Sequence, residues 1–321
     1  MRSFTVVNNT ELAAELNSDE QAREHREAFG YWADDSKARG TWRGGNVGDT
    51  RAAVAPFLAH EHFGDTYKWM LYGDDDTLFY MTGDDDTLFY MTGVLKLLSS
   101  FDPDQPLALT DNIWYYALHP SPHAPRLHAR AAPSCVVSMS GHGGAGIILS
   151  AGLMRLRPPR ELIDFIAQQK GCAGGDCLLG RALWYRLGIG FTDPGSALTH
   201  GSARYETYTR FVDSNLQMPS LVTLADPTAA LLNRRKGTAR VPACDAACVW
   251  LIENVVGTHA RAHLRQVNAT VAAMHRHLRT HDLAYQWVAE ARRDPDVAAG
   301  RMGVAKWVQK HHGTCRRSRQ H

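Results

Sequence analysis

Long apolar runs are missing from the sequence, and their absence argues against a membrane span. No stretch of 18 apolar residues occurs in the 321-residue chain, whereas a transmembrane helix needs about 20. The opening segment, MRSFTVVNNTELAAEL, is too polar to form the apolar core of a secretory signal. We therefore expect a protein that is either soluble or given without its targeting segment.

Cysteine is also scarce. The six cysteines are scattered along the chain, which excludes a small fold held together by disulfides. The close pairs Cys172/Cys177 and Cys244/Cys248 are candidates for bridges in an oxidising compartment. Neither pair has the doubled CxxC spacing that is typical of a structural zinc site.

Excess charge is absent as well, because the formal net charge is only +2. This low value argues against a nucleic-acid partner. Residues 261–321 are nevertheless basic, with 12 Lys and Arg against 4 Asp and Glu. Such a tail either binds a phosphate-rich partner or forms a solvated helical surface, and we favour the solvated surface.

The composition and the apolar patterning predict an α/β protein. Hydrophobic residues make up 44% of the chain and charged residues 21%, which is ordinary for a globular fold. Short apolar runs and helical periodicities alternate along the chain, and Gly188 closes one of the helices. The strands are predicted at 3–7, 67–72, 107–110, 135–139, 147–149 and 189–192, and the helices at 50–63, 93–101, 159–169, 176–187, 245–256 and 261–279. This order predicts a mixed, mainly parallel sheet flanked by helices.

A tandem repeat carries the most conspicuous acidic motif. The decapeptide GDDDTLFYMT occupies residues 73–82 and again 83–92. Three adjacent aspartates repel one another unless a cation or several backbone donors hold them. Oxygen ligands after a strand suit Mg²⁺ or Mn²⁺, although a solvated acidic turn also fits the pattern.

Two other acidic motifs are excluded by spacing. An EF-hand loop needs alternating acids and a glycine at its sixth position, where this chain has Phe79. A phosphatase motif of the D-x-D-x-T type, counted from Asp74, has Leu78 in place of its threonine. A phosphatase-like metal hydrolase is therefore a distant alternative.

Three sequence blocks together resemble the Fringe-like β1,3-glycosyltransferases in order and spacing. They are KWMLYGDDDT at 68–77, GGAG at 143–146 and GDCLLG at 175–180. In that family the first block is the DxD motif for metal and nucleotide, the second lines the donor-sugar pocket, and the third carries the catalytic aspartate. The resemblance covers about 42–212 and implies a GT-A-like fold.

The resemblance implies a role for each block. The aspartates would hold Mn²⁺ or Mg²⁺, which neutralises the charge that develops on the diphosphate leaving group. The glycines would let the backbone approach the sugar closely, unless they serve only tight packing. Asp176 would be the general base, unless it only caps the following helix. The implied ligands of donor and metal are Asp74, Asp75, Asp76, Gly143, Gly144, Ala145, Gly146 and His200, with Asp84 and Asp86 as the metal ligands of the alternative repeat copy.

The first repeat copy is the favoured one. It directly follows the strand predicted at 67–72, and that register lets Trp69 and Leu71 gain from burial. Asp84 to Asp86 would then begin the helix that leads into 94–98. In the opposite register the helix would run from 87 to 98, and the strand would be at 77–82.

The resemblance also implies an activity and a compartment. We expect an inverting, Mn²⁺-dependent transferase that moves a sugar from a UDP-sugar to a hydroxyl of a glycan or glycoprotein. The alternative is an inactive carbohydrate-binding or scaffolding relative. Family membership implies the Golgi or another secretory lumen, which the N-glycosylation patterns at Asn8 and Asn268 favour.

The chain divides into three predicted segments. Residues 1–41 would be a truncated start of the catalytic domain, 42–213 the GT-A-like catalytic domain, and 214–321 a mostly helical extension with the basic tail. We expect membrane attachment only through an N-terminal anchor that this sequence lacks.

Overall fold

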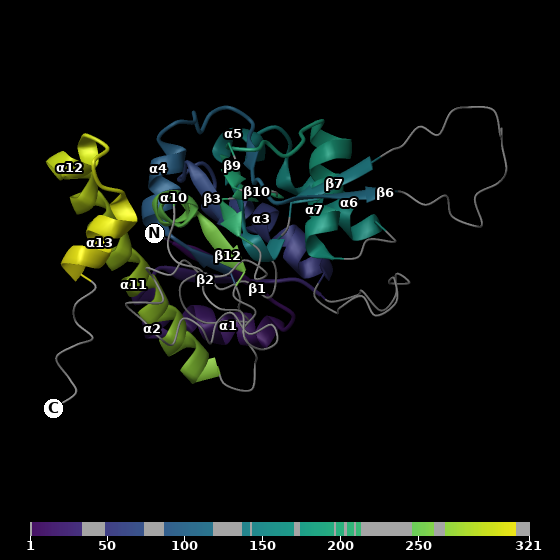
Figure 1. Cartoon of the computed structure of the whole chain (residues 1–321). Coiled ribbons are helices and arrows are strands. Elements are labelled where there is room, and N and C mark those ends of the chain that lie inside the picture. Colours follow the sequence, from purple (N-terminus) through teal and green to yellow (C-terminus); the bar gives the residue numbers. More distant parts are fainter. Residues whose placement is uncertain are drawn as a thin grey trace, which may run out of the picture. The chain divides into compact units, whose positions relative to one another are not determined.

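The chain folds as a mixed α/β protein, drawn in chain order from purple to yellow in Figure 1. The computed structural model describes residues 2–33, 49–73, 87–117, 137–141, 143–169, 174–195, 197–201, 204–208, 210–212, 246–259 and 267–312. Two compact units share the chain, and each consists of two segments. Unit 1 comprises Met1–Asp75 and Pro103–Asp193, and unit 2 comprises Asp76–Asp102 and Pro194–His321.

Unit 1 contains most of the predicted strands and helices. Its strands are β1 (Ser3–Val7), β2 (Glu27–Tyr31), β3 (Trp69–Tyr72), β5 (Ala108–Leu109), β6 (Ile113–Ala117), β7 (Val137–Gly141) and β8 (Ile147–Ser150). Its helices are α1 (Thr10–Ser18), α2 (Glu20–Glu24), α3 (Asp49–Phe63), α5 (Ala151–Met154), α6 (Pro159–Gln168) and α7 (Gly175–Ala182), with a 3₁₀ turn η2 (Gly143–Ala145) and a π-helical turn η3 (Leu183–Leu187).

Three small sheets order the strands of unit 1. In the central sheet, β8 lies between β3 and β5 and is antiparallel to both. A second sheet pairs β6 with β7 antiparallel, and the third pairs β1 with β2 parallel, with α1 and α2 between them in sequence. The register of the central sheet places Tyr72, the last residue of β3, opposite Ile147, the first residue of β8.

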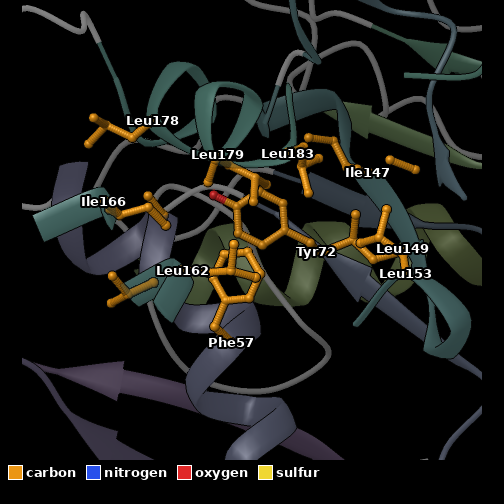
Figure 2. Packing of buried hydrophobic residues seen from close by; sticks show 14 of the residues in the cluster. Phe57, Tyr72, Ile147, Leu149, Leu153, Leu162, Ile166, Leu178, Leu179 and Leu183 are labelled. Atoms are coloured by element: carbon orange, nitrogen blue, oxygen red, sulfur yellow. The ribbon is translucent and has the colours of Figure 1, made fainter. Parts of the chain in front are cut away.

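The core of unit 1 packs helices against this central sheet. Phe57 of α3, Leu162 and Ile166 of α6, and the leucines of α7 surround Tyr72 and the apolar side chains of β8. Figure 2 shows the Tyr72 ring among these side chains, with Phe57 below it and Leu179 above. Since Tyr72 is only 3% exposed, the end of β3 is fixed firmly in the core.

Helix α7 ends as its sequence predicts. The last turn widens into η3, and Gly188 follows in the left-handed region with a φ of 68°. Glycine adopts this conformation at little steric cost, and for that reason it ends many helices. The α7 start and the η3 end are thus both fixed by local sequence.

Unit 2 contains short strands and the C-terminal helices. Its strands are β4 (Thr87–Phe89), β9 (Ala197–Gly201), β10 (Arg204–Tyr208), β11 (Phe211–Val212) and β12 (Gly257–His259), and its helices are α4 (Met91–Leu98), α10 (Ala246–Asn254), α11 (Val267–Arg293), α12 (Pro295–Ala298) and α13 (Val304–His312). β12 lies between β11 and β4, and β9 pairs with β10 antiparallel. Apolar side chains of α10, α11 and α13 form its core.

The prediction of a mainly parallel sheet is wrong for the described strands. Only the pairs β1–β2 and β11–β12 are parallel there, and the other five pairs are antiparallel. A parallel sheet needs a crossover, usually a helix, between successive strands. The strands predicted at 67–72, 107–110 and 147–149 instead form the antiparallel sheet β3–β8–β5.

The secondary structure of the second repeat copy also differs from the expectation. Helix α4 begins at Met91, so Asp84 to Asp86 do not begin it, and Thr87–Phe89 form β4 instead of the helix of the opposite register. β4 pairs with β12, a partner about 170 residues away in the sequence that no local pattern identifies. The three-segment division of the chain stays a prediction.

Candidate functional site

The glycine block forms a buried turn between two strands. Gly143, Gly144 and Ala145 make the 3₁₀ turn η2, and all three are buried. The turn closes where the Gly146 amide donates to the Gly143 carbonyl oxygen over 2.8 Å. Gly146 has a φ of 96°, a conformation that strains any residue with a Cβ. The block therefore presents backbone, without long side chains, at the start of β8.

Asp176 lies in the first turn of α7 and is half-buried. Its Oδ1 accepts a hydrogen bond of 2.6 Å from the Cys177 amide. Its Oδ2 accepts a longer one of 3.4 Å from the Gly143 amide. The N-cap residue is Gly174, so the alternative in which Asp176 is itself the N-cap is wrong. Asp176 lies inside the first turn, where the helix dipole still stabilises a carboxylate.

The two hydrogen bonds bring together two blocks that are separate in the sequence. Gly143 and Asp176 are 33 residues apart, yet the carboxylate contacts the glycine turn directly. Asp176 is only half-buried, so part of its surface stays accessible to solvent. The arrangement combines a proton acceptor with a backbone surface that has little steric bulk.

The strand that precedes the first aspartate triplet ends at the same sheet edge. Tyr72 pairs with Ile147, and Ile147 directly follows the glycine block. Gly73 then leads from Tyr72 to Asp74 within two residues of the sequence. The chain therefore emerges towards its acidic motif beside the turn that contacts Asp176.

The predicted metal ligands lie largely outside the described residues. Asp74, Asp75, Asp76, Asp84 and Asp86 all fall within 74–86, which the structure does not describe. His200 lies in β9 of unit 2, opposite Tyr205 in the register with β10. In the described part of the chain, no three His, Cys, Asp or Glu side chains gather into a group that could hold a metal ion.

One buried residue near the site, Ser140, was not assigned a role from the sequence. Ser140 in β7 is fully buried, and its Oγ has no hydrogen-bond partner among the described residues. No sequence signal marks it apart from its place just before the glycine block. Cys177 is disulfide-bonded, in keeping with the candidate bridge read from the sequence, and its pairing with Cys172 stays a prediction because Cys172 lies outside the described residues.

Comparison with known protein families gave no match, and comparison with curated proteins gave no significant match either. None of the helices that the structure describes combines the length and the apolar character needed to cross a bilayer.

Proposed function

We propose that the chain is an inverting glycosyltransferase that transfers a sugar from a UDP-sugar to a hydroxyl of a glycan or glycoprotein. The observation that carries this proposal is the contact between Asp176 and the glycine turn, at the sheet edge where β3 leads into the first aspartate triplet. The same three blocks carry the resemblance to the Fringe-like β1,3-glycosyltransferases. Their proximity in unit 1 supports a shared role.

In this proposal the residues act by position. The sugar would approach from the side of the half-buried Asp176, because Gly143, Gly144 and Ala145 of η2 are themselves buried and present no long side chain there. Asp176 takes the proton from the acceptor hydroxyl as its oxygen attacks the anomeric carbon. The bond to UDP breaks on the opposite face, UDP leaves with the electron pair, and the configuration inverts.

A divalent ion completes the proposal. Mn²⁺ or Mg²⁺ would be held by the first aspartate triplet, and when bound it would neutralise charge on the departing diphosphate. The proton transfer assigned to Asp176 depends on its own position and not on the geometry of this ion. The proposed site of action is the Golgi or another secretory lumen.

The alternative function is a non-catalytic carbohydrate-binding or scaffolding relative. One observation favours it, because both Asp176 oxygens accept backbone hydrogen bonds, as a purely structural carboxylate would. In that case Asp176 would only fasten α7 to η2. The two functions make opposite predictions for the removal of the negative charge.

Asp176→Asn is the test of the proposal. The amide keeps an oxygen that can accept from the Cys177 amide, but it cannot take up the acceptor's proton. We expect kcat for Mn²⁺-dependent transfer from a UDP-sugar to fall by about 100-fold or more, while the donor KM and the melting temperature stay nearly unchanged. The measurement is UDP release with each of a panel of UDP-sugars and acceptors.

The matched control is Asp164→Asn, which changes an exposed aspartate of α6 in the same unit. It should leave UDP release and stability unaltered. A fall in the melting temperature of Asp176→Asn, with turnover per folded molecule intact, would favour the structural alternative.

A further inference from the structure

Cys177 lies next to the proposed base, in the first turn of α7. It is disulfide-bonded, only 4% exposed, and part of the unit 1 core together with Leu178 and Leu179. A disulfide restricts the backbone on both sides of the half-cystine. The first turn of α7 is thus fixed covalently as well as by packing.

The same residue holds the carboxylate directly. Its backbone amide donates the 2.6 Å hydrogen bond to Asp176 Oδ1, and the other carboxylate oxygen then lies in reach of the Gly143 amide. This bond joins adjacent residues, so the direction of the carboxylate follows the backbone of the Asp176–Cys177 pair. A movement of Cys177 therefore moves Asp176.

The N-cap residue offers no side-chain hydrogen bond that could restrain the first turn of α7 in place of the disulfide. Gly174 has no side chain, and no side-chain hydrogen bond caps α7. The space around the carboxylate is also tight, since a Cβ built on Gly174 would lie 3.0 Å from Asp176 Oδ1. The carboxylate is confined between the backbone of Gly174, the amide of Cys177 and the glycine turn.

We infer that the Cys177 disulfide is a positioning device, which holds the Asp176 carboxylate against the Gly143 amide in the orientation needed for proton transfer. The inference rests on the proposed function for its catalytic part. Its structural part, the coupling of the Cys177 disulfide to the turn η2, does not depend on the proposed function. Loss of the bridge should loosen the first turn of α7 and release the turn that Asp176 contacts.

The first experiment compares Cys177→Ala with the wild-type chain by amide hydrogen exchange. Alanine keeps a good helix former in α7 and removes the bridge. We expect exchange to accelerate about tenfold in peptides covering residues 175–182 and also in those covering 143–146, because the carboxylate that links them is no longer held. The matched control is Cys248→Ala in α10 of unit 2, which should leave both peptides unchanged.

Chemical reduction reaches the same state without a substitution. A water-soluble phosphine gives two electrons to the sulfur–sulfur bond, two protons complete the thiols, and the phosphine becomes its oxide with an oxygen from water. The reduced wild-type chain should show the exchange pattern of Cys177→Ala. Its far-UV circular dichroism should stay that of the oxidised protein, which shows that the fold persists.

The second experiment measures UDP release with UDP-glucose, UDP-galactose and UDP-N-acetylglucosamine. Loss of the bridge should lower kcat by about 100-fold, the effect of a displacement of about 1 Å, with the donor KM changed little. Unchanged exchange in residues 143–146 would overturn the inference, and so would an unchanged kcat in an active enzyme. If the oxidised wild-type chain released no UDP with any acceptor, the proposed function would fall, and the exchange of the glycine turn would alone decide the positioning role.

Discussion

At the level of single residues, His60 illustrates how burial changes the charge of a side chain. It lies in α3, is 9% exposed, and its Nδ1 is 2.8 Å from the Tyr67 hydroxyl. Burial lowers the pKa of the imidazole, and the nearby Asp65 carboxylate opposes this only in part. His60 is therefore neutral in the folded protein under conditions where the unfolded chain would protonate it.

This shift predicts a loss of stability in mild acid. Below the unfolded pKa of about 6.5, the unfolded chain binds a proton that the folded chain does not. The free energy of unfolding should therefore fall as the pH decreases from that value to the lower folded pKa. His60→Gln, which can still hydrogen-bond to Tyr67, should show a shallower fall in urea unfolding measured at pH 7.5, 6.5 and 5.5.

Gln21→Ala is the control for this prediction, because Gln21 is an exposed, uncharged side chain of the same unit. It should leave the pH dependence as it is in the wild-type chain. Identical pH profiles for the wild type and His60→Gln would contradict the assignment.

Asp176 shows what the sequence predicts for one residue and what it does not. Its place at the start of a helix followed from the apolar spacing after it, and α7 begins there. Its contact with Gly143 is tertiary and spans 33 residues. Hydrophobic periodicity carries no information about such a contact. The resemblance alone placed both residues in one site.

At the level of elements, strong local patterns were predictive and weak ones were not. α3, α6 and the α7 start lie close to their predicted bounds, because apolar spacing, a proline start and a terminal glycine define them. β2, with the sequence EAFGY, was missed. Its glycine and glutamate are unusual in strands, and its pairing with β1 compensates for this poor propensity.

Close packing between elements is visible at Gly93. A Cβ built on this residue of α4 would lie 1.8 Å from the Val255 carbonyl oxygen, so the helix touches backbone that follows α10. Alanine normally stabilises a helix by about 1 kcal/mol relative to glycine. We predict the opposite sign here, with Gly93→Ala destabilising unit 2 by about 1–3 kcal/mol, measured by chemical denaturation.

Two controls separate this clash from other effects. Gly303→Ala makes the same change in unit 2 where a Cβ would meet no atom within 4 Å, and it should be neutral or slightly stabilising. Leu95→Ala changes a side chain on α4 that is 65% exposed and should cost little. A stabilised Gly93→Ala variant would show that α4 does not pack as described.

At the level of the whole molecule, the boundary between the two units lies inside the first copy of the repeat, between Asp75 and Asp76. β3 of unit 1 precedes the first copy, and β4 of unit 2 is formed by Thr87–Phe89 within the second. The sequence predicted β3, because its aromatic and apolar run is long enough for a buried strand. It did not predict β4, because a duplicated segment has the same propensity in both copies, and only tertiary pairing distinguishes them.

The position of each triplet relative to its strand predicts which copy binds metal. In the sequence, Asp74 to Asp76 follow the carboxyl end of β3, whereas Asp84 to Asp86 precede the amino end of β4. The last residue of β3, Tyr72, is buried and pairs with Ile147, which directly follows the glycine turn. We therefore expect Asp76→Ala to weaken Mn²⁺-dependent UDP binding by about 100-fold or more, since a bound divalent ion contributes several kcal/mol, and its matched control Asp86→Ala to bind as the wild type does.

Calorimetric titration of UDP, in Mn²⁺ and again in EDTA, measures both variants under the same conditions. Wild-type binding that persists in EDTA would remove the metal from the proposal altogether. Loss of binding in Asp86→Ala alone would assign the metal to the second copy, which precedes a strand of unit 2. The glycine turn and Asp176 of unit 1 would then need a different explanation for their contact, because the sheet edge shared by Tyr72 and Ile147 would no longer lead to the metal ligands.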